Sequence, residues 1–170
     1  MKKLLCFSGS TRVDSTCMAI LKTIGERHKD KADFVVYSGL ASLPHFDPNA
    51  EDAALPEAVH ALRAAVAAAD AVIFCTPEYV FSVPAILKNA IEWCVASTVF
   101  SDKPTAMIVA SGVGEKTFES LGLILKTIQC KIAAPTMLHL KGIRAKMLTG
   151  ELNDDGVLAK LDQLFAALMA

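Results

Sequence analysis

The chain has 170 residues and a mass of 18.1 kDa, a length typical of one compact domain and too short for a two-domain enzyme. Hydrophobic residues make up 53% and charged residues 21% of the sequence, which excludes intrinsic disorder because it provides enough apolar surface for a core. The 17 basic and 18 acidic residues give a formal charge of −1, without the basic excess typical of proteins that bind nucleic acid or anionic membranes. We therefore expect a small-molecule partner, no nucleic-acid partner and no membrane partner.

No apolar stretch approaches the roughly 20 residues that a membrane-spanning helix requires, since the run at residues 64–75 is interrupted by Asp70. The apolar N-terminal segment ends at Ser8 and Gly9 and is too short for the core of a signal peptide. We therefore expect a cytoplasmic protein. The five cysteines have no C-x-x-C pair and no metal-ligand spacing to the four histidines, which predicts reduced thiols and no metal site.

Five short apolar runs alternate with longer segments of helical periodicity along the chain. Near-continuous apolar runs are typical of parallel strands that are buried on both faces, and the predicted strands are residues 3–7, 34–37, 71–76, 106–110 and 136–140. Spacings of three and four between apolar residues, together with capping residues and prolines in first turns, indicate the helices. These are residues 15–28, residues 55–69, a helix that Ser82 caps and that has Pro84 in its first turn, and residues 115–130 and 154–169.

This alternation predicts repeated βαβ units, and right-handed crossovers leave few topologies for them. We interpret residues 1–170 as one α/β domain, a flavodoxin-like three-layer sandwich with a five-stranded parallel sheet of order 2-1-3-4-5. The topology then reverses between strands 1 and 3, and ligands bind at such a crevice, outside the carboxyl ends of the strands. The loops after strands 1, 3 and 4 are therefore the candidate functional loops.

The loop after strand 1, residues 8–16, consists mostly of small and hydroxylic residues that lead directly into a helix. Gly9 permits turns that point backbone N–H groups inward, Ser10 and Ser15 offer hydroxyls, Arg12 adds charge, and the helix N-terminus adds positive potential. This chemistry suits a phosphate group. The alternative is that these residues only cap a helix that follows a strand.

The loop after strand 3, residues 76–84, contains two aromatic residues between prolines, Tyr79 and Phe81. Fixed backbone with exposed N–H and C=O groups can read the edge of a heterocycle, and an aromatic side chain can pack near its face. The alternative is a turn whose aromatic residues are buried in the core or in a subunit interface. The loop after strand 4, residues 111–114, brings two glycines where backbone can approach a ligand closely, and no G-x-G-x-x-G dinucleotide fingerprint follows a strand.

Two motifs in these loops resemble those of NAD(P)H-dependent FMN reductases, a flavodoxin-like family that includes quinone, chromate and azo-dye reductases. They are Gly-Ser-Thr-Arg-Val-Asp-Ser at residues 9–15, and Pro-Glu-Tyr at 77–79 followed by Pro84 and by Leu-Lys-Asn-Ala-Ile-Glu-Trp at 87–93. The resemblance also covers Leu-Pro-His-Phe-Asp-Pro at residues 43–48. It implies noncovalent FMN, NADPH or NADH as electron donor, a small-molecule acceptor such as a quinone, chromate or azo compound, and a homodimer or homotetramer.

The resemblance implies the following cofactor-binding residues by position: Ser10, Arg12, Ser15, Thr16 and Cys17 around the FMN phosphate; Pro77, Glu78, Tyr79 and Val80 along the isoalloxazine ring; and Ser111, Gly112 and Gly114 flanking the ring. It implies no catalytic side chain, because flavin N5 accepts and donates the hydride. Three positions depart from the family pattern. Cys17 stands where Asn is common, Val80–Phe81 where Asn-Gly is common, and Ala85 where Gly is common. Phe81 is expected to narrow the pocket or to cover the flavin face.

Two other functions remain open at this point. Cys6 and Arg12 have the C-x5-R spacing of phosphatases that place a thiolate beneath a phosphate-binding loop, although Cys6 falls within a predicted strand. A flavodoxin-like domain that binds flavin or a nucleotide without turnover is the second. The basic residues between 141 and 146 are interpreted as a solvated loop, with contact to a nicotinamide phosphate as the alternative.

A surface for self-association is expected on the helix after strand 3. Its predicted core stripe consists of Val83, Leu87, Ile91, Cys94 and Val95. Three apolar residues lie off this stripe and would be exposed at a dimer interface: Ile86, Ala90 and Trp93.

Overall fold

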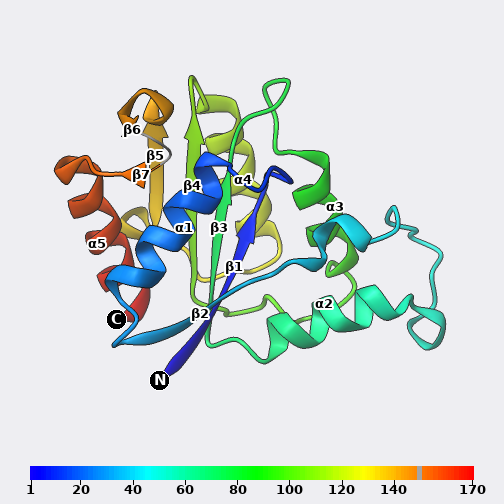
Figure 1. Ribbon diagram of the computed structural model, residues 1–170. Helices are drawn as coiled ribbons and strands as arrows, with labels where there is room; N and C mark the ends of the chain where they lie inside the picture. The colour runs from blue at the N-terminus through cyan, green and yellow to red at the C-terminus, as the bar shows by residue number, and fades with distance from the viewer. Residues whose placement is uncertain (149–150) are drawn as a thin grey trace.

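The computed structural model, which describes residues 1–148 and 151–170, contains one five-stranded parallel sheet of order β2-β1-β3-β4-β5 (Figure 1). Its strands are β1 (Lys2–Ser8), β2 (Ala32–Val36), β3 (Ala71–Thr76), β4 (Thr105–Ser111) and β5 (Met137–Lys141). The helices are α1 (Thr16–Arg27), α2 (Glu57–Ala67), α3 (Ala85–Trp93), α4 (Glu115–Thr127) and α5 (Asp155–Met169). The predicted fold class and strand order are confirmed.

Helices cover both faces of the sheet, α1 and α5 on one and α2, α3 and α4 on the other. Successive side chains of a strand point to opposite faces, so that in β1 Leu4 and Cys6 join the core under α1 and α5, while Leu5 and Phe7 join the other. Among the described residues, none of the helices is both long and apolar enough to cross a membrane.

Short elements that the sequence pattern did not predict complete the fold. Between β5 and α5 the chain forms a 3-10 turn, Ile143–Lys146, and a small antiparallel pair, β6 (Met147–Leu148) and β7 (Glu151–Leu152). Other 3-10 turns lie at Gly39–Ser42, Asp52–Ala54 and Ala134–Thr136. Thr136, predicted as the first residue of a strand, therefore belongs to a turn, and Tyr37 follows β2 instead of ending it.

The helix after strand 3 differs from the prediction at its start and in its buried face. Ser82 does not cap it. The residue before α3 is Pro84, and no side chain caps the helix. Ala90 and Trp93 are buried, whereas Val95 is exposed.

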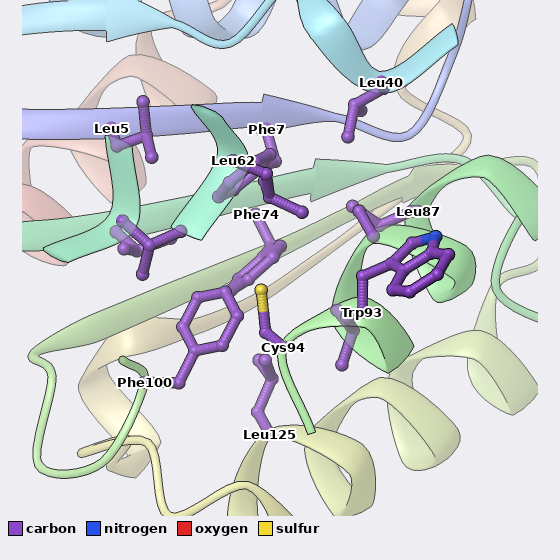
Figure 2. Close-up of a cluster of buried hydrophobic side chains, with 14 of the residues drawn as sticks. Leu5, Phe7, Leu40, Leu62, Phe74, Leu87, Trp93, Cys94, Phe100 and Leu125 are labelled. Atoms are coloured by element: carbon purple, nitrogen blue, oxygen red, sulfur yellow. The ribbon is translucent and has the colours of Figure 1, made fainter. Parts of the chain in front are cut away.

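The burial of Trp93 has a clear physical reason. Its indole N–H donates to the carbonyl of Pro44 at 2.8 Å, and its ring meets Phe46 edge-on with centroids 5.3 Å apart. Asn89 holds the same segment, donating to Pro44 O at 2.9 Å and accepting from Phe46 N at 2.8 Å. The segment that covers α3 fills the place where a second subunit was expected, and Trp93 points into the core beside Leu87 (Figure 2). The predicted exposure of Ala90 and Trp93 is wrong.

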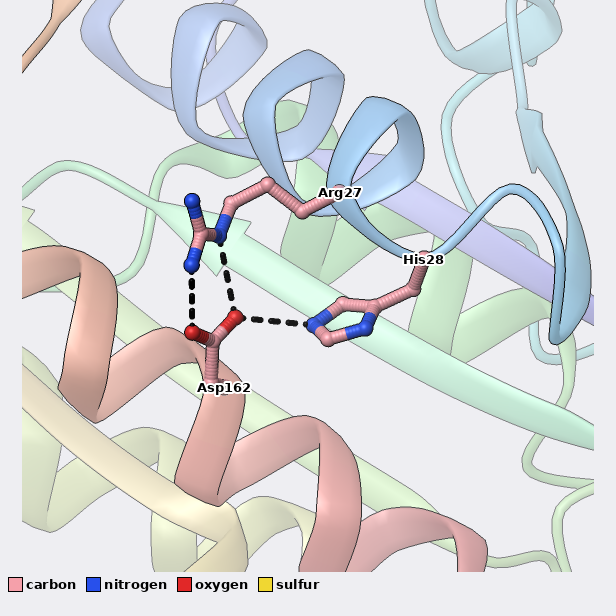
Figure 3. Close-up of polar contacts among 3 residues, drawn as sticks. All are labelled: Arg27, His28 and Asp162. Carbon is pink, nitrogen blue, oxygen red and sulfur yellow. Dashed lines mark hydrogen bonds and ion pairs between the residues drawn. The ribbon is translucent and has the colours of Figure 1, made fainter.

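The C-terminal end of α1 is joined to α5 by a polar contact (Figure 3). Asp162 accepts hydrogen bonds from both Nε and the guanidinium amino group of Arg27, and His28 Nε2 lies 3.0 Å from the same carboxylate. The His28 ring stacks on Phe165 with centroids 3.9 Å apart. This contact lies at the end of α1 opposite its N-terminus, and it fixes how α1 lies beside α5.

Candidate functional site

A cleft of about 240 Å³ lies at the carboxyl ends of β1, β3 and β4, where the predicted topology reverses. Nine of the twelve predicted site residues line it: Ser10, Arg12, Ser15, Thr16, Cys17, Pro77, Tyr79, Ser111 and Gly112. Sequence reasoning missed four other lining residues: Asp14, Ala110, Ile143 and Arg144. Glu78, Val80 and Gly114 do not line the cleft. The three candidate loops therefore form one site.

The β1–α1 loop is held by hydrogen bonds among its own residues. Ser8 Oγ donates to Ser10 O at 3.1 Å and accepts from Ser10 N at 3.3 Å, and Ser10 Oγ accepts from Arg12 N at 3.3 Å. Because Ser10 Oγ accepts here, its own proton can be donated to a ligand. Gly9 is required by packing, since a Cβ at this position would lie 2.8 Å from Thr76 Cβ.

The N-terminus of α1 opens onto the same loop. Ser15 caps the helix as predicted, its Oγ accepting from Met18 N at 3.1 Å. The N–H groups of Thr16 and Cys17 are the first two of the helix and have no intrahelical acceptor, so they are available to an anion, which the helix dipole also favours. The Cys17 side chain is buried, and this residue therefore offers its backbone N–H to the site.

Two arginines, Arg12 and Arg144, line the cleft, and neither forms an ion pair among the described residues. The other two arginines of the sequence are paired, Arg27 with Asp162 and Arg63 with Asp52. Arg144 comes from the 3-10 turn after β5. The basic segment at 141–146 was the only sequence signal for this residue, and its conformation brings Arg144 to the cleft.

The loop after β3 divides its residues between the cleft and the next helix. Pro77 and Tyr79 line the cleft, whereas the Glu78 carboxylate accepts hydrogen bonds from Gly114 N at 3.1 Å and Thr117 N at 3.0 Å. Burial acts to raise the pKa of Glu78, but these hydrogen bonds outweigh it and lower the pKa below its usual value. Glu78 thus ties the β3–α3 loop to the N-terminus of α4.

Val80 and Phe81 form the tip of this loop, both with left-handed backbone at φ 52° and 54°. Their side chains are exposed and do not line the cleft. The predicted alternative, in which the aromatic residues of this loop are buried in the core, is wrong for Phe81.

The β4–α4 loop closes the cleft on the other side. A Cβ at Gly112 would have no heavy atom within 4 Å, so this wall of the cleft has free space where a flat group can approach the backbone. Gly114 has φ 90° and caps α4, and a Cβ there would lie 2.7 Å from His139 Nε2. Gly114 therefore determines the conformation of the loop without lining the cleft.

Cys6 cannot be the nucleophile of a phosphatase. It lies inside β1, fully buried, and burial raises its pKa to about 12. Its thiol is therefore protonated at neutral pH and is not a nucleophile. The C-x5-R interpretation is wrong.

Comparison with known proteins identifies the family. The family model described as "NADPH-dependent FMN reductase" matches residues 2–139. The chain belongs to this family. Its members are oxidoreductases that use FMN as cofactor and a reduced nicotinamide dinucleotide as electron donor, so the predicted family, enzyme class and cofactors are confirmed.

Individual relatives agree with this assignment. The chain is 32% identical to the NADH:(hydroxy)cinnamate reductase subunit CrdA of Vibrio ruber, over 95% of this chain and 82% of the relative. It is 34% identical to an NAD(P)H-dependent FMN reductase of Pseudomonas aeruginosa, over 64% of this chain and 60% of that protein. The fold matches the flavoenzyme NAD(P)H:(acceptor) oxidoreductase FerB of Paracoccus denitrificans with a TM-score of 0.86, at 24% identity over 99% of this chain and 95% of that one.

Proposed function

We propose that this protein binds FMN in the cleft and transfers a hydride from NADPH or NADH through the flavin to a small acceptor such as a quinone, an azo compound or chromate. The observation that carries this proposal is the convergence of the three loops. Residues from all three loops line one cleft: Ser10, Arg12, Ser15, Thr16 and Cys17 offer donors suited to a phosphate, and Pro77, Tyr79 and Gly112 offer surfaces suited to a planar ring. A phosphate joined to a planar heterocycle fits that arrangement.

At the phosphate end, the hydrogen-bond donors come from a few residues of the cleft itself. The N–H groups of Thr16 and Cys17, the Ser10 hydroxyl and the Arg12 guanidinium face one cleft. A hydrogen bond to a charged group contributes about 1.5–3 kcal/mol, so a few such bonds are sufficient to hold a phosphate monoester. The net charge of −1 means that binding depends on these groups and not on a basic surface.

At the ring end, the residues of the chain orient the flavin ring and do not supply reactive groups. Pro77 fixes the backbone beside the heterocycle, Tyr79 adds an aromatic wall, and Gly112 leaves space on the opposite side. When bound, FMN supplies the hydride acceptance and donation that no side chain of the cleft can perform. The residues of the cleft orient the ring and limit water at its inner face.

Assembly and location remain predictions. The family resemblance predicts a homodimer or homotetramer, but Ala90 and Trp93, which suggested the contact surface, are buried. Light scattering at low protein concentration tests this prediction, since an 18.1 kDa particle contradicts it. A cytoplasmic location is likewise a prediction from the sequence.

The direct test is spectroscopic. Purified protein is titrated with FMN, and flavin fluorescence gives the Kd. The complex is then mixed anaerobically with NADPH or NADH and afterwards with a quinone. We expect the flavin absorbance to bleach and then to return. Protein that does not bind FMN contradicts the proposal, and FMN binding without oxidation of NADPH or NADH favours a non-catalytic flavin-binding module.

A further inference from the structure

The tip of the β3–α3 loop combines a tight turn with residues that disfavour it. Tyr79 and Ser82 exchange two backbone hydrogen bonds of 3.1 and 3.0 Å, and Val80 and Phe81 between them have φ 52° and 54°. Two consecutive left-handed residues define a type I′ turn, which prefers Asn-Gly or Asp-Gly. A β-branched residue such as Val is an outlier at positive φ. The turn is therefore strained in this chain.

The strain is not offset by burial. Val80 is 95% and Phe81 71% exposed, so neither side chain gains stability by packing in the core. Among the described residues, the other non-glycine residues with positive φ are Asp102 and Gln129. Both are polar and occur singly, and Asp tolerates this conformation better than Val or Phe. Folding preference thus does not explain why Val and Phe occupy positions 80 and 81, and strain of this kind is commonly kept where it serves function.

The residues on both sides of the tip contact the rest of the fold. Tyr79, directly before it, lines the cleft, and Glu78 anchors the loop to the N-terminus of α4. Val83, just after the turn, is buried. The segment between β3 and α3 extends past the carboxyl ends of the strands in Figure 1. Val80 and Phe81 are therefore exposed and directly follow Tyr79, a residue of the cleft, and their apolar side chains carry no charge, unlike the two arginines that line it.

We propose that Val80 and Phe81 form an apolar lip that determines acceptor specificity, favouring neutral planar aromatic acceptors over inorganic anions. This inference rests on the proposed function of the cleft. A planar aromatic molecule above the ring gains apolar contact with the lip. A compact anion gains nothing from it, because the lip offers no charge or hydrogen-bond donor from its side chains.

A small molecule suits the lip better than a second copy of the chain. An aromatic side chain buries about 150–250 Å², so Tyr79, Val80 and Phe81 together fall short of the roughly 800 Å² per partner of a stable protein interface.

The test compares wild type with the double variant Val80→Asn/Phe81→Gly, which gives the turn its preferred residues. Because the strain is removed, we expect Tm to rise by roughly 3–6 °C, and because the variant is more stable, loss of folding cannot explain a loss of function. The FMN Kd is expected to stay within about threefold, since neither side chain lines the cleft. The value of kcat/KM is measured for 2-methyl-1,4-naphthoquinone and for ferricyanide, with the same electron donor.

We expect kcat/KM for the naphthoquinone to fall by about tenfold or more and that for ferricyanide to change by less than about threefold, because burial of part of one ring contributes about one factor of ten. The matched control is Val95→Asn, an exposed apolar residue after α3, which should change neither value. An unchanged acceptor ratio in the double variant, or an equal fall for both acceptors, overturns the proposal.

Two further readouts separate the possible failures. If wild-type protein fails to bind FMN or to oxidise NADPH and NADH, the proposed function of the cleft fails. If wild type is active and the double variant keeps the wild-type acceptor ratio, only the lip fails. A change in molecular mass by light scattering, together with equal loss toward both acceptors, makes the tip a subunit contact and also overturns the proposal.

Discussion

The two ends of the cleft are built according to different rules. At the phosphate end, Ser15 caps α1 in an extended conformation, the serines of the loop bond to neighbouring backbone, and no residue of the β1–α1 loop has positive φ. Directly after Tyr79, which we assign to the ring end, the exposed residues Val80 and Phe81 adopt a backbone conformation that their side chains disfavour. The backbone at the phosphate end therefore has the conformation that its residues prefer. The turn after Tyr79 has a conformation that its residues disfavour.

This difference indicates which end of the cleft is common to FMN-binding proteins and which end distinguishes this protein. A phosphate group is the same in every flavin mononucleotide, and relaxed local chemistry is sufficient to bind it. The acceptor differs between enzymes, and the strained positions are the ones that we propose to contact it. The following predictions test whether the two ends are indeed separable.

The largest effect is expected for Gly9→Ala at the phosphate end. A Cβ at this position would lie 2.8 Å from Thr76 Cβ and 3.1 Å from Thr76 Cα, where β1 and β3 run side by side. We expect a loss of about 2–3 kcal/mol in the free energy of unfolding, measured by urea denaturation, and weaker FMN binding. Gly112→Ala is the control, because its Cβ meets no atom within 4 Å. Equal stability of the two variants would show that the β1–α1 loop is not packed as described.

Arg12→Gln should separate binding from stability. Arg12 is exposed, lines the cleft and has no ion pair among the described residues. Loss of a charge-assisted hydrogen bond to phosphate, about 1.5–3 kcal/mol, corresponds to an increase of roughly 10–150-fold in the FMN Kd. Tm should not change. Lys160→Gln, an exposed cation on α5, provides the control. An unchanged FMN Kd would show that Arg12 does not contact the phosphate.

Glu78→Gln should show a pH-dependent loss of stability. The folded-state pKa of Glu78 is lowered from 4.5, so the carboxylate stabilises the fold above that value, and this contribution disappears as the pH falls through the lowered pKa. We expect the variant to be less stable by about 1 kcal/mol at pH 7 and by less at pH 4. Urea denaturation at both pH values measures this.

The exposed Glu119, on the helix α4 that Glu78 contacts, provides the control for Glu78. Glu119→Gln removes only a surface pair with Lys116, which is worth little. A difference between wild type and Glu78→Gln that is the same at pH 4 and pH 7 would contradict the role of the charge.

The smallest effect is expected for Asp162→Asn, far from the cleft. It weakens the contact of Asp162 with Arg27 and His28, which is partly exposed and thus worth about 1 kcal/mol or less. Thermal unfolding should show a slightly lower Tm, and the FMN Kd should not change. Asp33→Asn, an exposed acid on β2, is the control. A shift in the FMN Kd would mean that the packing of α1 on α5 controls the phosphate end.

The sequence predicted much of this molecule because buried parallel strands need continuous apolar runs, and β3 was predicted residue for residue. The cap at Ser15 was also predictable, because a hydroxyl side chain directly before a helix commonly caps it, whereas Ser82, predicted on the same basis, does not cap α3. The orientation of Trp93 was not predictable from periodicity. It depends on the carbonyl of Pro44, 49 residues away in the sequence.

By itself, the amino-acid sequence determined the fold, the family and most of the cleft lining, because these depend on local patterns and on short motifs at the carboxyl ends of strands. Only the tertiary structure decided that Arg144 joins Arg12, that Glu78 turns toward α4, and that Val80 and Phe81 are strained and exposed. The positions of Arg144 and Glu78 depend on contacts between segments distant in the sequence, which no local preference specifies, and the turn at Val80 and Phe81 adopts a conformation that the local preferences of these residues disfavour.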